Sequence, residues 1–192
     1  MKLFILLFSL FTISAFSQDK KDSVINYTDI NGNKQGYWEK KYKNEQIAYK
    51  AYFIDDMLTG KYIRYYKSGK KMSVINYGDT AGTGYAKIYY DNGVKGAEGR
   101  VIKNKIKDEL WKFYGIDGAL ISKVNYKNGK KDGLCINYFR NGNKSEEIKY
   151  KNDVQNGIWR RFYENGKTIF ETNYKNGTRD GIIKVKKKNG FL

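Results

Sequence analysis

Residues 157–181 read GIWRRFYENGKTIFETNYKNGTRDG, and related stretches recur along the chain at a nearly constant interval. Five of the six intervals between copies are 24 residues long, and one is 25. A fixed period of this size is typical of a stacked array in which each unit contacts only its neighbours. The first residue of each copy is the anchor of its unit, and the anchors are Gly36, Gly60, Gly84, Glu109, Gly133, Gly157 and Gly181.

Each unit contains two strand-like runs, and each run ends in a turn signal. In the quoted copy the turn signals are Asn165-Gly166 and Asn176-Gly177. Asn and Gly tolerate the positive φ that tight hairpin turns require. The Tyr, Phe, Ile and Val residues between the turns favour strands. We therefore predict an all-β fold, an elongated antiparallel ribbon of tandem β-hairpin repeats.

The repeat divides the chain into whole and half units. Six complete repeats occupy residues 36–180. The sequence SVINY at 23–27 is identical to residues 73–77, so residues 18–35 are an N-terminal half repeat, and residues 181–192 are a C-terminal half repeat. The second residue after the anchor is a large aromatic in several units, and we expect this slot to pack between repeats. It holds Trp38, Trp111 and Trp159.

The N-terminal residues 1–17 have the pattern of a signal peptide. Lys2 precedes an apolar run, and Ala15 and Ser17 supply the small residues of a cleavage site before Gln18. The run is short for a membrane span, so we expect a removed signal peptide and no transmembrane span in the mature chain. The alternative is a buried N-terminal segment. Export would place the protein in the periplasm, in the cell envelope or outside the cell.

The residue types needed for most catalysis are missing. The chain has no histidine and one cysteine, Cys135, which we expect to be a small buried residue of the core. Serine–histidine and cysteine–histidine catalysis and a thiolate zinc site are therefore excluded, and no phosphate-binding loop motif is present. Glu98, Glu147 and Glu171 share one slot of the repeat. They fit cross-strand partners of lysines better than an acid/base pair. We expect no enzyme activity, no cofactor, no metal and no small-molecule substrate.

The pattern G-x-W-x-x-[FY]-Y-x-N-G-K followed by E-x-x-Y-K-N-G resembles the MORN-repeat family, and in particular its bacterial variant with YwqK-type antitoxin-like repeats. The resemblance covers about residues 23–192 and implies an array that binds partners or membranes. Four positions depart from the pattern. They are Glu45 for the turn glycine, Glu109 for the anchor glycine, and Ala86 and Cys135 for the large aromatic.

Basic residues alternate with aromatic residues on the expected strands. The formal net charge is +17, and removal of residues 1–17 with Lys2 leaves 36 basic and 20 acidic residues, a net charge of +16. This excess fits a face that binds anionic lipid head groups or acidic polysaccharide, with nucleic acid less favoured. The alternative is a solvated strand surface. The candidate binding surface is Arg64, Tyr65, Tyr66, Tyr89, Tyr90, Tyr138, Arg160, Arg161 and Tyr163.

We interpret the sequence as an exported, non-enzymatic repeat protein that provides a binding or scaffolding surface for a protein or an anionic envelope partner. The first alternative is an antitoxin or immunity-like protein that neutralises a toxin by direct binding. A more distant alternative is an envelope-associated hydrolase. A neutraliser would form a tight complex with one protein, whereas a scaffold would bind polymers or surfaces with a strong dependence on salt.

Overall fold

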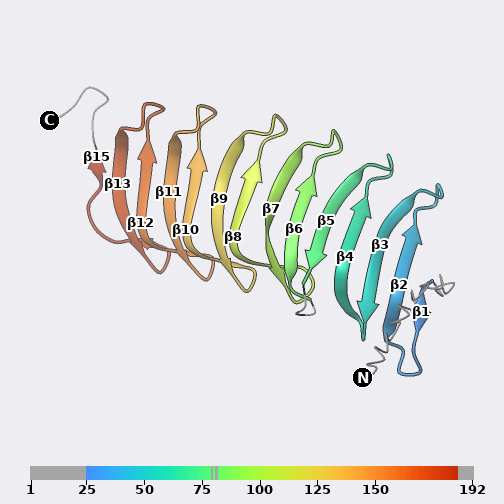
Figure 1. Ribbon diagram of the computed structural model, residues 1–192. Helices are drawn as coiled ribbons and strands as arrows, with labels where there is room; N and C mark the ends of the chain where they lie inside the picture. The colour runs from blue at the N-terminus through green and yellow to red at the C-terminus, as the bar shows by residue number, and fades with distance from the viewer. Residues whose placement is uncertain (1–24, 79, 81, 186–192) are drawn as a thin grey trace, which may run out of the picture.

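The computed structural model describes residues 25–78, 80 and 82–185, and the expected signal peptide at 1–17 lies outside them. The described chain is built of β-strands and contains no helix, which confirms the all-β prediction. All strands belong to one antiparallel sheet in which neighbours in sequence are neighbours in space. The result is a single elongated ribbon whose strands run across its long axis (Figure 1).

The described residues form fifteen strands of the ribbon. The first half contains β1 (Tyr27–Thr28), β2 (Lys34–Lys41), β3 (Ile47–Ile54), β4 (Met57–Tyr65), β5 (Lys71–Tyr77), β6 (Gly84–Tyr89) and β7 (Lys95–Ile102). The second half contains β8 (Ile106–Tyr114), β9 (Leu120–Lys127), β10 (Lys130–Tyr138), β11 (Lys144–Lys151), β12 (Val154–Phe162) and β13 (Thr168–Lys175). β14 (Thr178–Arg179) and β15 (Lys184–Val185) both pair with β13, so they are two pieces of one interrupted strand position.

Several repeat anchors coincide with bulges in the ladder, although Gly84 lies in a regular ladder between β5 and β6. Between β3 and β4, for example, Lys50 pairs with Ile63 and Tyr52 pairs with Thr59, so three residues around Gly60 face one residue of β3. Gly60 has a φ of 60°, a backbone conformation that glycine adopts without steric cost. Glu109 holds the same left-handed region at 56°. The bulge therefore persists where the anchor glycine is replaced.

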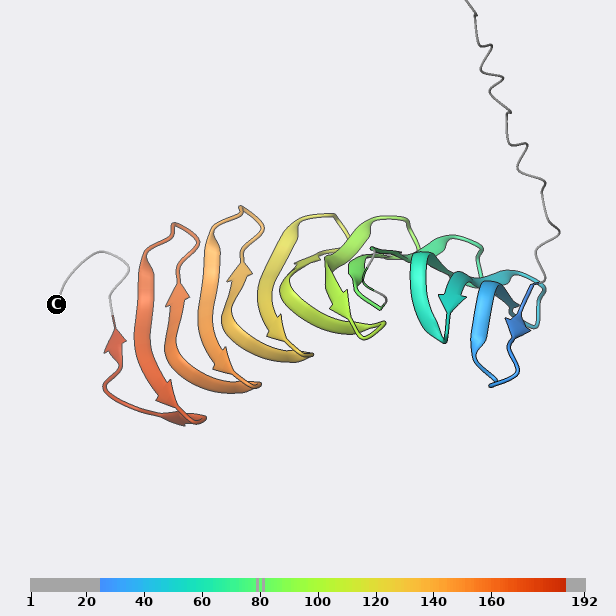
Figure 2. The ribbon, with the colours of Figure 1, turned by 60° about the horizontal axis from the view of Figure 1, so that its bottom comes forward.

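One row of side chains forms the centre of the core and crosses almost every strand. This core row consists of the residues two and fifteen positions after each anchor, which lie opposite one another across the ladder, as Trp38 does with Ala51. Other apolar residues are buried beside the row, namely Phe53, Leu58, Tyr77, Ala97 and Val101. Trp111 is the most deeply buried residue of the row, with 1% of its surface exposed. Successive strands curve in the same sense along the ribbon (Figure 2). The buried members of the row are Ala51, Tyr62, Ile75, Ala86, Gly99, Trp111, Val124, Cys135, Ile148 and Thr172.

Hydrogen bonds also link successive repeats along both long margins of the ribbon. At the margin that holds the first turn of each repeat, the hydroxyl of Tyr42 donates to the carbonyl of Tyr65 over 2.7 Å. At the opposite margin, the amide of most second turns donates to the strand that follows the preceding turn, whereas the amide of Asn104 donates to the carbonyl of Gly82 within the preceding turn. Asp153 N to Lys131 O (2.9 Å) and Gly177 N to Gln155 O (2.9 Å) are two such bonds. Successive repeats are thus joined at their centre by the ladder and, in most of the array, by hydrogen bonds at both margins.

Candidate binding surface

The ribbon has two chemically different faces. Side chains alternate between faces along a strand, so the core row defines a core face, and the intervening residues define an outer face. On β3, Ala51 and Phe53 are buried on the core face, whereas Tyr52 and Ile54 are exposed on the outer face. Lysine and arginine occur on both faces. The face that suits an anionic partner is therefore the one whose lysines and arginines do not already form ion pairs with carboxylates.

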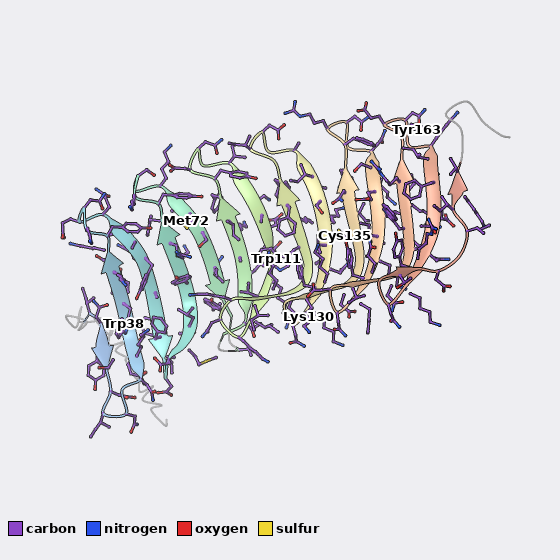
Figure 3. The ribbon with its side chains drawn as sticks, turned by 180° about the vertical axis from the view of Figure 1, so that it is seen from behind. Trp38, Met72, Trp111, Lys130, Cys135 and Tyr163 are labelled. Atoms are coloured by element: carbon purple, nitrogen blue, oxygen red, sulfur yellow. The ribbon has the colours of Figure 1, made fainter. Side chains whose placement is uncertain are left out.

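The structure does not gather the nine predicted binding residues into one patch. By alternation from the core row, Arg64 and Arg161 belong to the core face, and Tyr65, Tyr89, Tyr138 and Arg160 belong to the outer face. Tyr66, Tyr90 and Tyr163 follow the ends of their strands and lie at the first-turn margin. Figure 3 shows Tyr163 at this margin and Lys130 at the other, with Trp111 and Cys135 between them.

Two of the margin tyrosines use their hydroxyls to join repeats. Tyr66 donates to the carbonyl of Tyr89 over 2.7 Å, and Tyr90 donates to the carbonyl of Tyr114 over 2.8 Å. Each bond connects equivalent positions of successive repeats, as the bond of Tyr42 does. These side chains therefore have a structural role, whatever they contact in addition.

The outer face carries a row of carboxylates that are already paired. Glu147 is 7% exposed and accepts from Lys144 over 2.6 Å, and Arg160 lies 3.5 Å from it. The same guanidinium donates to Glu171 over 2.5 Å, and these two carboxylates raise the pKa of Arg160. Because Arg160 is held between two carboxylates, it has little positive charge to offer a partner on this face.

Glu98, two repeats earlier, is also paired with nearby donors. Its carboxylate accepts from the Tyr114 hydroxyl over 2.5 Å and from Lys95 Nζ over 2.9 Å. These two donors lower the pKa of Glu98 and so favour its ionised form. Glu98 and Glu147 thus have cationic partners, as the sequence predicted for this slot. The lysines, however, are on the same strand as the carboxylates rather than on the next one.

The core face carries a concave region near the N-terminal end of the ribbon. Two adjoining hollows of about 480 Å³ and 450 Å³ share Tyr49, Tyr62 and Lys105 in their walls. Basic side chains of β2, of β4 and of the turn between β7 and β8 surround them. We call this region the cationic hollow and define it by Lys34, Lys40, Arg64, Lys103, Lys105, Tyr49 and Tyr62.

Distant parts of the chain assemble the cationic hollow. Lys103 and Asn104 form the turn between β7 and β8, and both have positive φ. The side-chain oxygen of Asn104 accepts a hydrogen bond from the amide of Leu58 over 3.2 Å, which ties this turn to β4. Lys105 then lies with its Nζ 5.3 Å from the ring centre of Tyr62. One turn therefore brings two lysines beside an arginine of a strand about 40 residues earlier.

The cations of the hollow are largely uncompensated. Within residues 25–78, 80 and 82–185, none of Lys40, Arg64 and Lys103 forms an ion pair. Among the described residues, Asp56 is the one acidic residue in the walls, and its carboxylate accepts a hydrogen bond from the backbone amide of Lys34 over 2.9 Å. An anion placed in the hollow would therefore meet several cations and one carboxylate.

Lysines cover the edge of the core elsewhere on the same face. Lys107 Nζ lies 5.0–5.2 Å from the ring centres of Trp111, Phe113 and Tyr126. Burial and the nearby charge of Lys131 lower the pKa of Lys107. Lys131 has a similar position over Tyr150, at 5.0 Å. These lysines are packed against aromatic rings, so they contribute more to the core than to a binding site.

Sequence reasoning identified Arg64 but missed Lys34, Lys40, Lys103, Lys105, Tyr49 and Tyr62. One signal was available, because the single 25-residue interval runs from Gly84 to Glu109 and contains Lys103 and Lys105. The described residues contain no cluster of three potential metal ligands. They also contain no helix long and apolar enough to cross a membrane.

Comparisons with known proteins agree with the architecture. Three segments match the family model described as MORN repeat variant, at residues 58–79, 131–152 and 155–176. The chain therefore contains MORN repeats of the variant type, and such repeats generally bind proteins or membranes. A comparison with curated proteins found no match.

Proposed function

We propose that this array of MORN-variant repeats is an exported, non-enzymatic binding protein that engages an anionic envelope partner through the cationic hollow of its core face. The observation that carries the proposal is the group of unpaired cations around the hollow. Attraction between such cations and an anion is strong at low salt and screened over a Debye length of about 10 Å at 0.1 M. We therefore expect binding that weakens sharply as salt rises.

The experiment compares two variants with equal charge change. The first replaces Lys40, Arg64 and Lys105 by glutamine. The control variant replaces the exposed outer-face residues Lys61, Lys87 and Lys127 by glutamine. Binding to anionic vesicles and to an acidic polysaccharide is measured by co-sedimentation at low and high salt. We expect the first variant to lose most of its binding at low salt and the control variant to retain it.

Several outcomes decide between the alternatives. Equal loss in both variants would overturn the role of the hollow and leave only a general effect of charge. Loss of binding to vesicles alone or to polysaccharide alone identifies the source of the anion. If neither is bound at low salt, a single protein partner becomes the better explanation, and with it the antitoxin-like alternative.

The expected export has its own test. The N-terminal pattern favours cleavage between Ser17 and Gln18, and residues 1–17 contain no acidic residue. N-terminal sequencing of protein from the envelope and the medium should begin at Gln18. Recovery of protein that still begins at Met1 from the envelope or the medium would contradict the proposal of a removed signal peptide.

A further inference from the structure

In the part of the chain that the structure describes, the two ends of the ribbon are open edges of the sheet, and apolar side chains are exposed at both. At the N-terminal end, Ile25 is 53% exposed and Tyr27 is 49% exposed. At the C-terminal end, Ile183 is 46% exposed and Val185 is 68% exposed. An open edge also presents backbone donors and acceptors that can pair with another strand.

These exposed residues occupy core slots of the repeat. Ile25 and Tyr27 correspond to Ile75 and Tyr77, which are each 6% exposed within the ribbon. Ile183 occupies the slot that holds Trp111 and Trp159 in other repeats. The residues are exposed because each end has half a repeat, with only one of the two strands that bury the core row.

The two half repeats are complementary. β1 belongs to the second half of a repeat, and β15 belongs to the first half. Strands β12 and β15 both run antiparallel to β13, and β1 and β3 both run antiparallel to β2. A β1 strand placed beside β15 would therefore continue the antiparallel alternation of the sheet.

We propose that the C-terminal edge of one copy pairs with the N-terminal edge of a second copy, so that the two half repeats form one complete repeat. The ladder inside the ribbon specifies the register. Gly157 lies opposite Tyr174, and Trp159 lies opposite Thr172. By the same offsets, Gly181 lies opposite Tyr27 of the second copy. In the single ribbon Ile25 and Asn26 form a turn before β1, with a φ of 62° at Asn26. Pairing of Ile183 with Ile25 of the second copy therefore requires this turn to become extended, as the equivalent residues Ile75 and Asn76 are in β5.

This contact is heterologous, because it joins different surfaces of identical molecules. Each added copy presents a new free edge, so association continues into longer ribbons rather than stopping at a dimer. The contact involves about one strand from each copy, which places it among the small, weak interfaces. Association should therefore rise with protein concentration.

The first test is sedimentation velocity of the purified protein from low concentration up to about 1 mM, where a weak contact becomes populated. We expect species of increasing length. The variants Ile25→Lys and Ile183→Lys each block one end, so each alone should remain monomeric. The control Ile116→Lys changes a residue that is 65% exposed in a turn away from both ends, and it should associate as the parent does.

Mixing the two blocked variants distinguishes this arrangement from a symmetric dimer. The free C-terminal edge of Ile25→Lys should pair with the free N-terminal edge of Ile183→Lys, so the mixture should contain dimers and nothing longer. Association of either variant alone would indicate an interface between like ends and overturn the proposal. A parent protein that is monomeric at all concentrations would overturn it as well.

Cross-linking tests the register directly. Directly opposed residues of an antiparallel pair have Cα atoms about 4.5–5.5 Å apart, which a disulfide can span. The one native cysteine, Cys135, is buried. Oxidation of an equimolar mixture of Ile25→Cys and Ile183→Cys should give a cross-linked dimer, whereas either variant alone should not. Cross-links that form equally well in the single-variant samples would contradict the register.

Discussion

Gly99 is the smallest residue of the core row, and replacing it by valine should destabilise the ribbon. Gly99 lies opposite Trp111, and a Cβ atom on Gly99 would lie 2.5 Å from the Cγ and Cδ2 atoms of the indole. The backbone of Gly99 does not have positive φ, so the obstacle is steric contact alone. The sequence suggests the opposite, because the equivalent slots hold Ile75 and Val124 and glycine weakens a strand interior.

The expected magnitudes follow from the packing around the indole. Overpacking a core typically costs about 1–3 kcal/mol, so Gly99→Val should lower the free energy of unfolding by that amount. Trp111→Ala removes a side chain that is 1% exposed and whose indole N–H donates to the carbonyl of Arg100 over 2.8 Å. Loss of a buried tryptophan costs about 3–5 kcal/mol. The valine of the double variant would occupy space left by the indole, so the double variant should lose less than the sum.

Thermal and urea denaturation of the three variants, followed by circular dichroism, measures these differences. In a chain of this size, 1 kcal/mol changes the Tm by about 2–4 °C. The control Asn173→Val adds the same β-branched side chain at an exposed strand position and should leave the Tm nearly unchanged. A Tm that rises in Gly99→Val, or additivity of the two substitutions within about 0.5 kcal/mol, would refute the steric argument.

Three further predictions concern other contacts. Trp159→Ala should lower the free energy of unfolding by about 3 kcal/mol, because the indole packs edge-on against Phe170 with 4.8 Å between the ring centres. Arg161→Ala should lower it by roughly 0.5 kcal/mol or less. Equal Tm values for the two variants would contradict this prediction. Glu45→Gly should raise stability by about 1 kcal/mol, since Glu45 has a φ of 62° and only an exposed ion pair; an unchanged urea midpoint would count against it. Glu98→Gln should lower stability at pH 7. Because the pKa of Glu98 is lowered in the folded protein, the stability that the ionised carboxylate contributes is lost as pH falls. When Tm is measured as a function of pH, the Tm of Glu98→Gln should therefore converge with that of the parent below a pH of about 4. A Tm difference that stays constant with pH would contradict a stabilising role of the ionised carboxylate.

The repeat pattern was sufficient to predict the strands and their order. The two turn signals in each unit located the turns and predicted two strands per unit, and a sheet of consecutive hairpins is the simplest arrangement for such a pattern. Even the departures at Glu45 and Glu109 keep the local backbone, because both residues adopt the positive φ of the glycines they replace. The local geometry is imposed by the neighbouring ladder, and one unfavourable residue does not alter it.

The candidate site was less accessible from the sequence. The repeat pattern did not identify which face of the ribbon is buried. The cationic hollow depends on a bond between Leu58 and Asn104, which are 46 residues apart. A period of 24 describes contacts between adjacent repeats, so it cannot predict a turn that reaches past a whole hairpin. Such contacts depend on the exact length and direction of a loop.

The link between Asn104 and Leu58 also has a mechanical consequence. The strands run across the ribbon, so a force applied along its long axis pulls neighbouring strands apart. Every pair of neighbouring strands bears the full force, and the ribbon separates at the pair that is held most weakly. Asn104 of the β7–β8 turn binds β4 directly and also donates its amide to Gly82 over 2.8 Å. This turn therefore connects β4 to the β7–β8 hairpin across β5 and β6, and a force that separates β5 from β6 must also break the hydrogen bond between Asn104 and Leu58.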